Sequence, residues 1–540
     1  MSQMEFEVES KDVLGRIGRL TTKSGVVETP HLFPVVNPLT QPIPPKEIYE
    51  RIGCKAVMTN AYLVKKNLEE EAIKRGIHGL LDFKGVVATD SGAYQILTYG
   101  DVKVSASEIA VFQERINSDI AVILDVPTGL KATREYARWT VQETLRRADE
   151  TLKLTKKRDV LWVGPVQGGI HLDILAESAR EISKRPFAVY ALGSPTQIME
   201  KYMFERLVDM IVTAKMNLLL NKPLHLFGAG HPSMFALAVA LGCDLFDSAA
   251  YALYARAGRY LTESGTLRLD EIEYLPCTCP ICVREDSSNL KEMDRKLRET
   301  LLAEHNLYVC MEEMRRIRQA ILEGRLWELV ELRAHCHPSL LQALKRVGLY
   351  SSFLEKHSPS TKRKGLLYFG HEGLPRPEIT RYKKRLVERY KPPAKAKVLV
   401  IVPYQNDKPY HKSRPIRRIL QEVSEKREVH LSVCAAPFGI VPIEIDDIFP
   451  VSQTEMPFPP DEQTVECTFE SIVAYIAKSS YKSVIMHGRF EPCFEKLRDF
   501  CKKVCKEAGK KFKVSYSGIE FWTDEAIEKL RRSLRSDKVS

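Results

Sequence analysis

Residues 224–248 read LHLFGAGHPSMFALAVALGCDLFDS, and this stretch contains the unit from which the first half of the chain is built. Two short apolar runs, Leu224 to Gly230 and Cys243 to Asp247, each end in small or polar residues. The segment between the two runs fits a helix. A strand, a polar or glycine-rich loop, a helix and a second strand form a β/α repeat, so this stretch predicts parallel strands joined by helical crossovers.

The same unit recurs through the first half of the chain. Helical connectors with apolar residues three and four apart fit between most of the runs, for example Ala132 to Lys157 and Leu172 to Lys184. Eight strands alternating with helices over about 250 residues predict an α/β fold of the (β/α)8 barrel type, and a doubly wound open sheet is the alternative. The predicted strands are Thr29 to Val36, Ala56 to Asn60, Gly85 to Asp90, Ile120 to Asp125, Val160 to Gln167, Pro186 to Gly193, Leu224 to Gly230 and Cys243 to Asp247.

Most of these runs end in side chains that a core does not need. At the ends stand Asn60, Asp90 with Ser91, Asp125, Gln167 with two glycines, Gly193 with Ser194, Gly230 with His231, and Asp247 with Ser248. In a barrel all of these residues line the carboxyl-terminal mouth, where the catalytic groups of such folds lie. We therefore expect three aspartates, Asp90, Asp125 and Asp247, to face one pocket.

Composition places the chain among globular proteins. It has 540 residues, of which 44% are hydrophobic and 28% charged, and this length is enough for more than one folded unit. The longest apolar run, Phe235 to Cys243, is far shorter than the roughly 20 residues that cross a bilayer, so no membrane span is expected. The acidic N-terminus has no apolar signal segment. These features predict a cytoplasmic protein.

Cys277, Cys279 and Cys282 form a C-x-C-x2-C motif among the twelve cysteines of the chain. A cytoplasmic protein keeps its thiols reduced, so the cluster indicates a metal site rather than a disulfide framework. Three thiolates and the imidazole of His305, after 22 intervening residues, match a closed tetrahedral zinc site. His335 and His337 are the alternative fourth ligands. The sequence predicts one structural Zn2+ per chain.

Changes in composition divide the chain further. A Ser/Lys/Pro-rich stretch at 356–364 and the sequence KPPAK at 391–395 indicate linkers, and the apolar run VLVIVP at 398–403 opens a smaller α/β unit. We expect a barrel catalytic domain in residues 1–270, a zinc-binding helical subdomain in 271–345, a basic connector in 346–395 and a C-terminal α/β domain in 396–540.

Positive charge is concentrated where the basic connector meets the C-terminal domain. The chain has a formal charge of +11, and residues 381–418 alone hold thirteen basic and two acidic residues, which is the same excess. This concentration favours a polyanion such as nucleic acid as a partner, and a solvated helix face is the alternative. The residues expected to contact the nucleic acid are Arg381, Lys383, Lys384, Arg385, Lys412, Arg414, Arg417 and Arg418.

Residues 5 to 345 resemble a known protein family in five motifs and in the cysteine and histidine cluster that follows them. The motifs are Asp90-Ser91-Gly92-Ala93-Tyr94-Gln95, Asp125-Val126-Pro127, Val166-Gln167-Gly168-Gly169, Phe227-Gly228-Ala229-Gly230 and Phe246-Asp247-Ser248-Ala249. In this order and spacing they resemble the tRNA-guanine transglycosylase family. The long C-terminal extension resembles the archaeal branch, which inserts 7-cyano-7-deazaguanine (preQ0) at nucleotide 15 of the tRNA D-arm on the way to archaeosine.

The resemblance implies a role for each residue at the barrel mouth. Asp247 is the expected nucleophile, which forms a covalent ribosyl intermediate, and Asp90 is the expected acid and base. The expected contacts to the base are Asp125, Gln167, Gly168, Gly193, Ser91 and Tyr94, with Tyr94 stacking on the ring or packing in the core, and Ser91 bonding the base or ordering its loop. His171 and His231 are expected to be scaffold residues. The partners implied are tRNA and free guanine or preQ0, and a homodimer is expected.

Within the C-terminal domain, residues 403–413 (PYQNDKPYHKS) resemble a motif of archaeosine synthase. Tyr404 stands where that motif has a cysteine and Ile416 where it has a histidine. A phenol cannot replace a thiol in attack on a nitrile, so we interpret this domain as a non-catalytic relative. The archaeal branch often ends in a PUA domain, which is not recognised here, so a separate PUA-domain protein is a further expected partner.

Two other functions remain open at this point. One is insertion of deazaguanines into DNA, and the other is a non-catalytic tRNA-binding paralogue or subunit. The presence of both Asp90 and Asp247 argues against the second.

Overall fold

A computed structural model describes residues 6–93, 104–155, 157, 159–491 and 493–536. The chain divides into two compact units, which are described separately below. Unit 1 comprises Met1–Phe353 with His357–Pro359, and unit 2 comprises Leu354–Lys356 with Ser360–Ser540.

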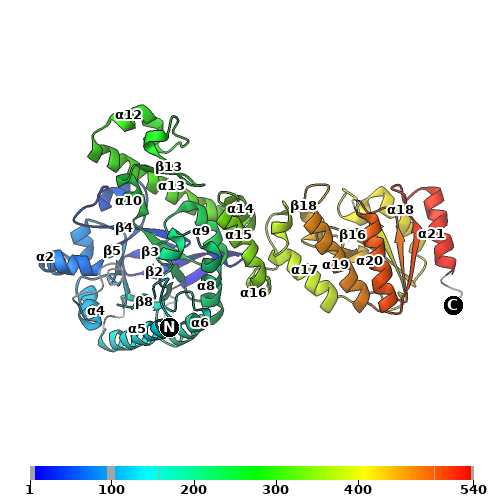
Figure 1. Cartoon of the computed structure of the whole chain (residues 1–540), viewed down its shortest axis with the longest axis horizontal. Helices are drawn as coiled ribbons and strands as arrows, with labels where there is room; N and C mark the ends of the chain where they lie inside the picture. The colour runs from blue at the N-terminus through cyan, green and yellow to red at the C-terminus, as the bar shows by residue number, and fades with distance from the viewer. Residues whose placement is uncertain (1–5, 94–103, 156, 158, 492, 537–540) are drawn as a thin grey trace. The chain divides into compact units, whose positions relative to one another are not determined.

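Eight parallel strands close into a barrel in unit 1 (Figure 1). Because β11 pairs with β4, the sheet has no free edge, and the predicted (β/α)8 barrel is confirmed over the doubly wound alternative. Phe33, Met58, Val122 and Val163 belong to the apolar cluster that fills the interior. The strands are β4 (His31–Val36), β5 (Ala56–Asn60), β6 (Val86–Asp90), β7 (Ile120–Val122), β8 (Leu161–Val166), β9 (Val189–Leu192), β10 (Leu224–Leu226) and β11 (Leu245–Ser248).

Helices connect successive strands around the outside of the barrel. Most carry an apolar stripe toward the strands and a charged outer face, whereas every residue of α9 is buried because α14 packs over it. The connecting helices are α1 (Pro45–Glu50), α2 (Ala61–Leu81), α4 (Ala106–Arg115), α5 (Arg134–Leu154), α6 (Leu172–Ser183), α7 (Thr196–Glu200), α8 (Phe204–Asn217) and α9 (Pro232–Ala240), and α10 (Ala250–Arg256) follows the last barrel strand.

An antiparallel sheet of β1 (Phe6–Asp12), β2 (Gly15–Thr22) and β3 (Gly25–Glu28) precedes the barrel and was not predicted from the sequence. Its residues Phe6, Leu20 and Val27 share the barrel's apolar cluster, so the sheet covers the amino-terminal end of the strands.

A helical region follows the last barrel strand. The hairpin of β12 (Arg259–Leu261) and β13 (Thr266–Arg268) leads to α11 (Pro280–Arg284), α12 (Ser287–Glu292) and the long α13 (Arg295–Glu323). Figure 1 shows this region beside α10. Unit 1 continues with α14 (Leu326–Ala334) and α15 (Pro338–Val347), and the residues of α16 (Ser351–His357) are divided between the two units.

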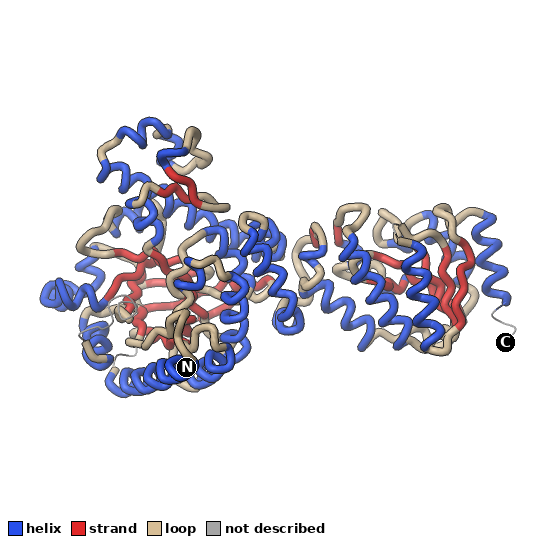
Figure 2. The backbone as a smooth tube through the Cα atoms, viewed as in Figure 1, coloured by secondary structure: helices blue, strands red, loops and turns tan. Residues whose placement is uncertain are grey.

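Unit 2 is a five-stranded sheet flanked by helices, as the sequence predicts (Figure 2). The strand order is β17–β16–β15–β19–β20, in which only β17 runs antiparallel to its neighbour. The strands are β15 (Val398–Pro403), β16 (Val429–Ala435), β17 (Gly439–Pro442), β19 (Ser483–His487) and β20 (Lys511–Tyr516). The helices are α17 (Pro377–Glu388), α18 (Arg414–Val423), α19 (Glu462–Lys478), α20 (Phe494–Glu507) and α21 (Asp524–Ser536).

In neither unit does a helix within the described residues combine the length and the apolar character needed to span a bilayer.

Candidate active site and metal centre

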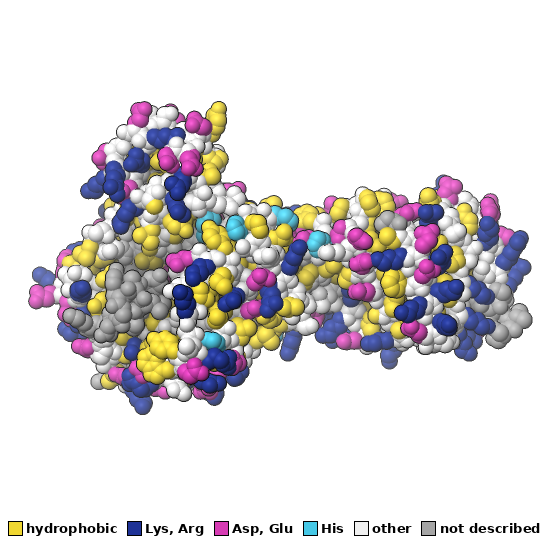
Figure 3. Space-filling model, in the orientation of Figure 1, with side chains coloured by type: hydrophobic (Ala, Val, Ile, Leu, Met, Phe, Trp, Pro, Cys, Tyr) yellow, Lys and Arg dark blue, Asp and Glu magenta, His cyan; other side chains and the backbone are white. Residues whose placement is uncertain are grey.

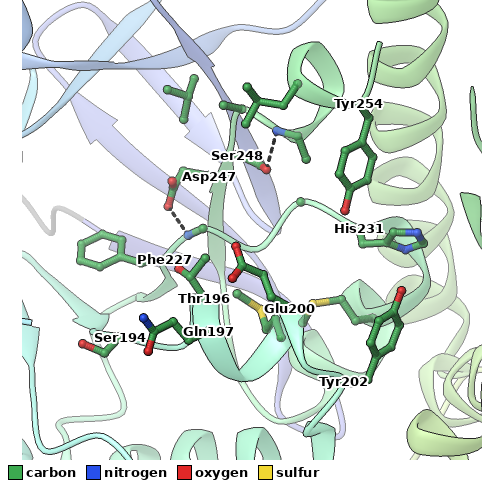
Figure 4. Close-up of a pocket in the computed structure, with 18 of the residues that line it drawn as sticks. Ser194, Thr196, Gln197, Glu200, Tyr202, Phe227, His231, Asp247, Ser248 and Tyr254 are labelled. Carbon is green, nitrogen blue, oxygen red and sulfur yellow. Dashed lines mark hydrogen bonds between the residues drawn. The ribbon is translucent and has the colours of Figure 1, made fainter. Parts of the chain in front are cut away.

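The carboxyl-terminal ends of the barrel strands surround a pocket of about 900 Å³. The expected side chains Asp90, Asp125, Gln167 and Asp247 all line it, although they come from four different strands or the loops that follow them. Figure 4 shows Asp247, Phe227 and Ser194 in this pocket. The barrel therefore brings together residues that lie up to 157 positions apart in sequence, from Asp90 to Asp247.

Asp247 is held in place by two hydrogen bonds to one carboxylate oxygen. Its Oδ1 accepts from the Gly228 amide at 3.0 Å, drawn in Figure 4, and lies 2.8 Å from His225 Nε2. The Asp247 side chain is 14% exposed, and the His225 side chain is almost fully buried, between the rings of Phe33 and Phe227. Since both contacts from described residues go to Oδ1, Oδ2 is the oxygen left to meet a ligand.

Asp90 lies at the end of β6 in a setting that favours its neutral form. Burial, together with the nearby carboxylates of Asp125 and Asp247, raises the pKa of Asp90 to about 7. Its Oδ2 accepts hydrogen bonds from Asn60 Nδ2 at 3.1 Å and from the Gly92 amide at 3.2 Å, which fix the orientation of the group. A carboxyl group with a pKa near 7 can both give and take a proton at neutral pH.

Asp125 and Gln167 form a buried pair deeper in the pocket. Gln167 Nε2 donates to Asp125 Oδ2, and burial raises the pKa of Asp125 to about 6. Gln167 Oε1 accepts from the Thr128 amide and from the Ser194 hydroxyl, each at 3.0 Å. These bonds fix which end of the Gln167 amide faces which neighbour, so the pair presents a defined set of donors and acceptors.

Two glycines make room for these side chains. A Cβ on Gly193 would lie 2.2 Å from Gln167 Nε2, and one on Gly230 would lie 1.9 Å from Ser248 Oγ. Both positions therefore require glycine for steric reasons.

Several other predicted residues have structural roles in the barrel. Ser91 is buried and donates to the Ile123 carbonyl at 3.0 Å, so its hydroxyl orders the loop. The Gly168 amide donates to Thr128 Oγ1 at 3.1 Å, and His171 Nε2 bonds the Ala132 carbonyl at 2.9 Å. For Ser91 this bond favours the second of the two expected roles, which is to order the loop, and the base contact expected of the Gly168 backbone stays a prediction. Tyr94 lies outside the described residues.

His231 lines the pocket while also serving the scaffold. Its Nδ1 accepts from the Ser233 amide at the start of α9, and its Nε2 lies 3.2 Å from Thr266 Oγ1. Burial lowers the pKa of His231 to about 4, so the ring is neutral at neutral pH.

His225 is the site residue that sequence reasoning missed. It lies between Leu224 and Leu226 in the middle of β10, where only a polar residue inside an apolar strand signals it. In a barrel strand such a residue can point inward, toward the mouth.

The predicted metal ligands form one cluster. Ligand atoms of Cys277, Cys279, Cys282 and His305 all lie within 4.8 Å of one another. Cys279 Sγ and Cys282 Sγ are 3.6 Å apart, close to the about 3.8 Å expected between two thiolates on one tetrahedral zinc. Both sulfurs lie 3.3–3.4 Å from His305 Nδ1. The donor set and spacing therefore fit a zinc ion.

Surrounding groups fix the histidine of this cluster. His305 Nε2 donates to the Leu261 carbonyl at 2.9 Å, which leaves Nδ1 to face the three sulfurs. The Tyr260 ring stacks on His305 at 3.7 Å. The alternative ligands lie elsewhere, since His335 bonds the Glu331 carbonyl and His337 begins α15.

The expected tRNA-contacting residues of unit 2 have different surroundings. Arg381 is buried and its Nε donates to Glu355 at 3.0 Å, so we correct it from a surface contact to an internal ion pair. Lys383 is half-buried against Cys467. Arg385, Lys412, Arg414, Arg417 and Arg418 are exposed, as is Lys384. On the face shown in Figure 3, basic and acidic side chains of unit 2 are interspersed.

Comparison with known families identifies two matching regions. The family described as queuine tRNA-ribosyltransferase matches residues 11–339, which include the whole barrel and the metal cluster. A domain of unknown function (DUF5591) matches residues 379–534, within unit 2.

Similar proteins from several archaea extend across both regions. A protein of Methanocaldococcus jannaschii is 44% identical over 84% of this chain and 69% of its own length. One of Sulfolobus acidocaldarius is 40% identical over 90% of this chain and 95% of its own, and one of Pyrobaculum aerophilum is 44% identical over 84% and 90%. Each of the three relatives is named tRNA-guanine(15) transglycosylase.

Proposed function

The chain belongs to the queuine tRNA-ribosyltransferase family, and from this premise we propose that it exchanges guanine at nucleotide 15 of tRNA for preQ0. As a member of this family it is an enzyme, a tRNA-ribosyltransferase. The observation that carries the proposal is the placement of three aspartates, Asp90, Asp125 and Asp247, around one pocket at the barrel mouth. Exchange of a base needs a nucleophile, a proton carrier and a group that recognises the base.

The first step releases guanine. Asp247 Oδ2 attacks C1′ of the ribose, a C1′–O bond forms, and the bond between C1′ and the guanine nitrogen breaks. The electron pair of that bond leaves with guanine, and protonated Asp90 supplies the proton that neutralises the departing base. A ribosyl ester on Asp247 remains, and the RNA backbone stays intact.

The second step reverses the first with a new base. The ring nitrogen of preQ0 attacks C1′, the ester bond breaks, and Asp247 recovers its electron pair while the proton of that nitrogen passes to Asp90. Two displacements retain the original configuration at C1′. The bonds made and broken are of the same kind, so the exchange needs no energy-supplying cofactor.

Recognition of the base is assigned to the buried pair. Ionised Asp125 accepts from the N1–H and the 2-amino group, an edge that guanine and preQ0 share. The fixed amide of Gln167 and the backbone of Gly193 face the opposite edge. A base flipped out of the RNA stack is read by such edge contacts in a closed pocket.

Zinc is assigned a structural role. Cys277, Cys279, Cys282 and His305 would complete a tetrahedral zinc site, and a zinc ion held there would link α11 and the segment before it to α13. The catalytic residues act without it.

The test is base exchange by the purified chain. Radiolabelled guanine should enter a tRNA with guanine at nucleotide 15, leave on a chase with preQ0, and not enter a transcript with adenine there. Asp247→Asn should abolish exchange and keep tRNA binding, whereas Asp159→Asn, an exposed aspartate before β8, should exchange normally. Exchange by Asp247→Asn would show that another residue is the nucleophile. Incorporation of the label into DNA alone would show that DNA, and not tRNA, is the substrate.

A further inference from the structure

The pocket continues past the three aspartates into an outer chamber. Its walls are Tyr202, His231, Tyr254, Arg259, Thr266 and His337. Figure 4 shows Tyr202, His231 and Tyr254 on the side of the pocket opposite Phe227 and Ser194. None of these side chains is needed to hold the departing or incoming base at Asp125 and Gln167.

Tyr202 has an unusual backbone for an aromatic residue. Its φ is 55°, in the left-handed region that costs little for glycine and about 1 kcal/mol or more for other residues. Its amide donates to the Met199 carbonyl at 3.0 Å, which holds this turn between α7 and α8. A strained aromatic residue at a pocket wall points to a use for the ring.

A neighbouring ring supports the ring of Tyr202. It stacks on His337, with ring centroids 4.7 Å apart and 25° between the planes, and the residue is still 54% exposed. His337 is itself fixed, because its Nδ1 accepts from the Ser339 amide at the start of α15. The Tyr202 ring is therefore supported by His337, it also meets Phe204 in a T-shaped contact, and its exposed part is open to a ligand.

A cation also lines the chamber. The guanidinium of exposed Arg259 lies 5.6 Å from the centre of the Tyr254 ring. Tyr254 is on α10, which begins two residues after the end of the strand that carries Asp247, so the chamber is joined to the nucleophile by one short segment. A flat aromatic face and a positive charge in the same pocket as the nucleophile match a base and a phosphate of one nucleotide.

We propose that the outer chamber binds the nucleotide next to the exchanged one, with its base stacked on Tyr202 and its phosphate at Arg259. This inference rests on the proposed function, since it places the target ribose at Asp247. Turning one nucleotide into the barrel breaks its stacking with its neighbours in the RNA, and the Tyr202 face replaces part of that stacking. The enzyme then requires an RNA strand in which the target base can unstack from both of its neighbours. A free nucleoside has no such neighbours.

The test is a binding cycle with the full chain. Dissociation constants are measured for wild type, Tyr202→Ala and Tyr202→Phe against tRNA and against two tRNAs that lack the base at nucleotide 14 or at nucleotide 16. Tyr202→Ala should weaken binding of intact tRNA about tenfold, and Tyr202→Phe should bind like wild type. For one of the two abasic tRNAs the effect of Tyr202→Ala should disappear. Tyr274→Ala, at an 89% exposed tyrosine outside the pocket, is the matched control and should bind like wild type.

Three outcomes would overturn the inference: no loss of affinity in Tyr202→Ala, the same loss with both abasic tRNAs as with intact tRNA, or no binding of tRNA by wild type. Exchange assays on the same preparations report separately on the proposed reaction. If the chain exchanges guanine but Tyr202 shows no coupling to a neighbouring base, only the proposed nucleotide site in the outer chamber is rejected. If the coupling is found but no guanine is exchanged, only the proposed reaction is rejected.

Discussion

Asp90 connects the electrostatics of the pocket to a pH dependence. Because its pKa is raised to about 7, it is mostly protonated below that pH and mostly ionised above it. Release of guanine uses the acid form, so its rate should fall as the pH rises through about 7. Attack by the incoming base uses the carboxylate, so that rate should rise over the same range. Single-turnover measurements of the two half-reactions against pH should therefore show one rate that falls and one that rises through about pH 7.

Asp125→Asn supplies the control for this assignment. The Asp125 charge is one of the causes that raise the pKa of Asp90, so its removal should move the limb of guanine release to lower pH. Asp90→Asn should remove the limb altogether. Parallel limbs in the two half-reactions, or an upward shift in Asp125→Asn, would show that another group carries the proton.

His225 is expected to be a positioning residue for the nucleophile. His225→Phe keeps an aromatic ring between Phe33 and Phe227 but loses the hydrogen bond to Asp247. A hydrogen bond to a charged group contributes about 1.5–3 kcal/mol, so kcat should fall roughly ten- to a hundredfold with KM for tRNA unchanged. His225→Gln, whose amide can donate to Asp247, should recover part of the rate. A raised KM with normal kcat would contradict the role.

At the level of residues, the sequence predicted the groups that chemistry requires and missed those that tertiary structure supplies. Asp90, Asp125 and Asp247 follow strands of one barrel, so topology alone predicts that they meet. Neighbouring strands decide whether the Ser91 hydroxyl faces the pocket or the scaffold, and they also decide whether His225 bonds Asp247. A single sequence does not contain that information.

The helix α11 and the segment before it, which carries Cys277 and Cys279, depend most on metal. They are short, and the ligands Cys277, Cys279, Cys282 and His305 link them to α13. Cys279→Ser should lower the zinc content well below one per chain and reduce the melting temperature by at least a few degrees. Cys336→Ser, a half-buried cysteine outside the cluster, is the control. Metal analysis and thermal melting test this, and full zinc in Cys279→Ser would contradict the ligand set.

At the level of elements, periodicity placed every barrel strand but not their ends. The predicted strand Ile120 to Asp125 stops at Val122, since Asp125 and its neighbours leave the ladder to meet Gln167 and Thr144. The sheet β1–β3 was missed because charged residues interrupt the apolar residues of its strands. Local pattern identifies an element, and contacts between elements decide where it ends.

At the scale of the whole molecule, unit 2 is a separately folded unit, and the sequence analysis predicts that it is not catalytic. Tyr404, in the position of the archaeosine-synthase cysteine, is half-buried beside Phe458, and burial raises its pKa to about 12. A phenol that stays protonated at neutral pH is a poor nucleophile. Ile416 is fully buried in the core of the unit. These features support the interpretation of unit 2 as a binding rather than a catalytic domain.

The exposed basic residues of unit 2 are then expected to contact phosphates of tRNA. Lys412, Arg414 and Arg417 are exposed at the start of α18, and their replacement by Gln should weaken tRNA binding and flatten its dependence on salt. Each lost phosphate contact reduces the slope of log K against log salt by about 0.7–0.9, so three contacts would reduce it by roughly two to three. Exchange of guanine at saturating tRNA should keep its rate, because the barrel is untouched. The control replaces Lys84, Lys153 and Lys184, which are exposed at the opposite end of the barrel from the mouth, and should leave the slope unchanged. An equal slope in both triple variants would show that the α18 charges face only solvent.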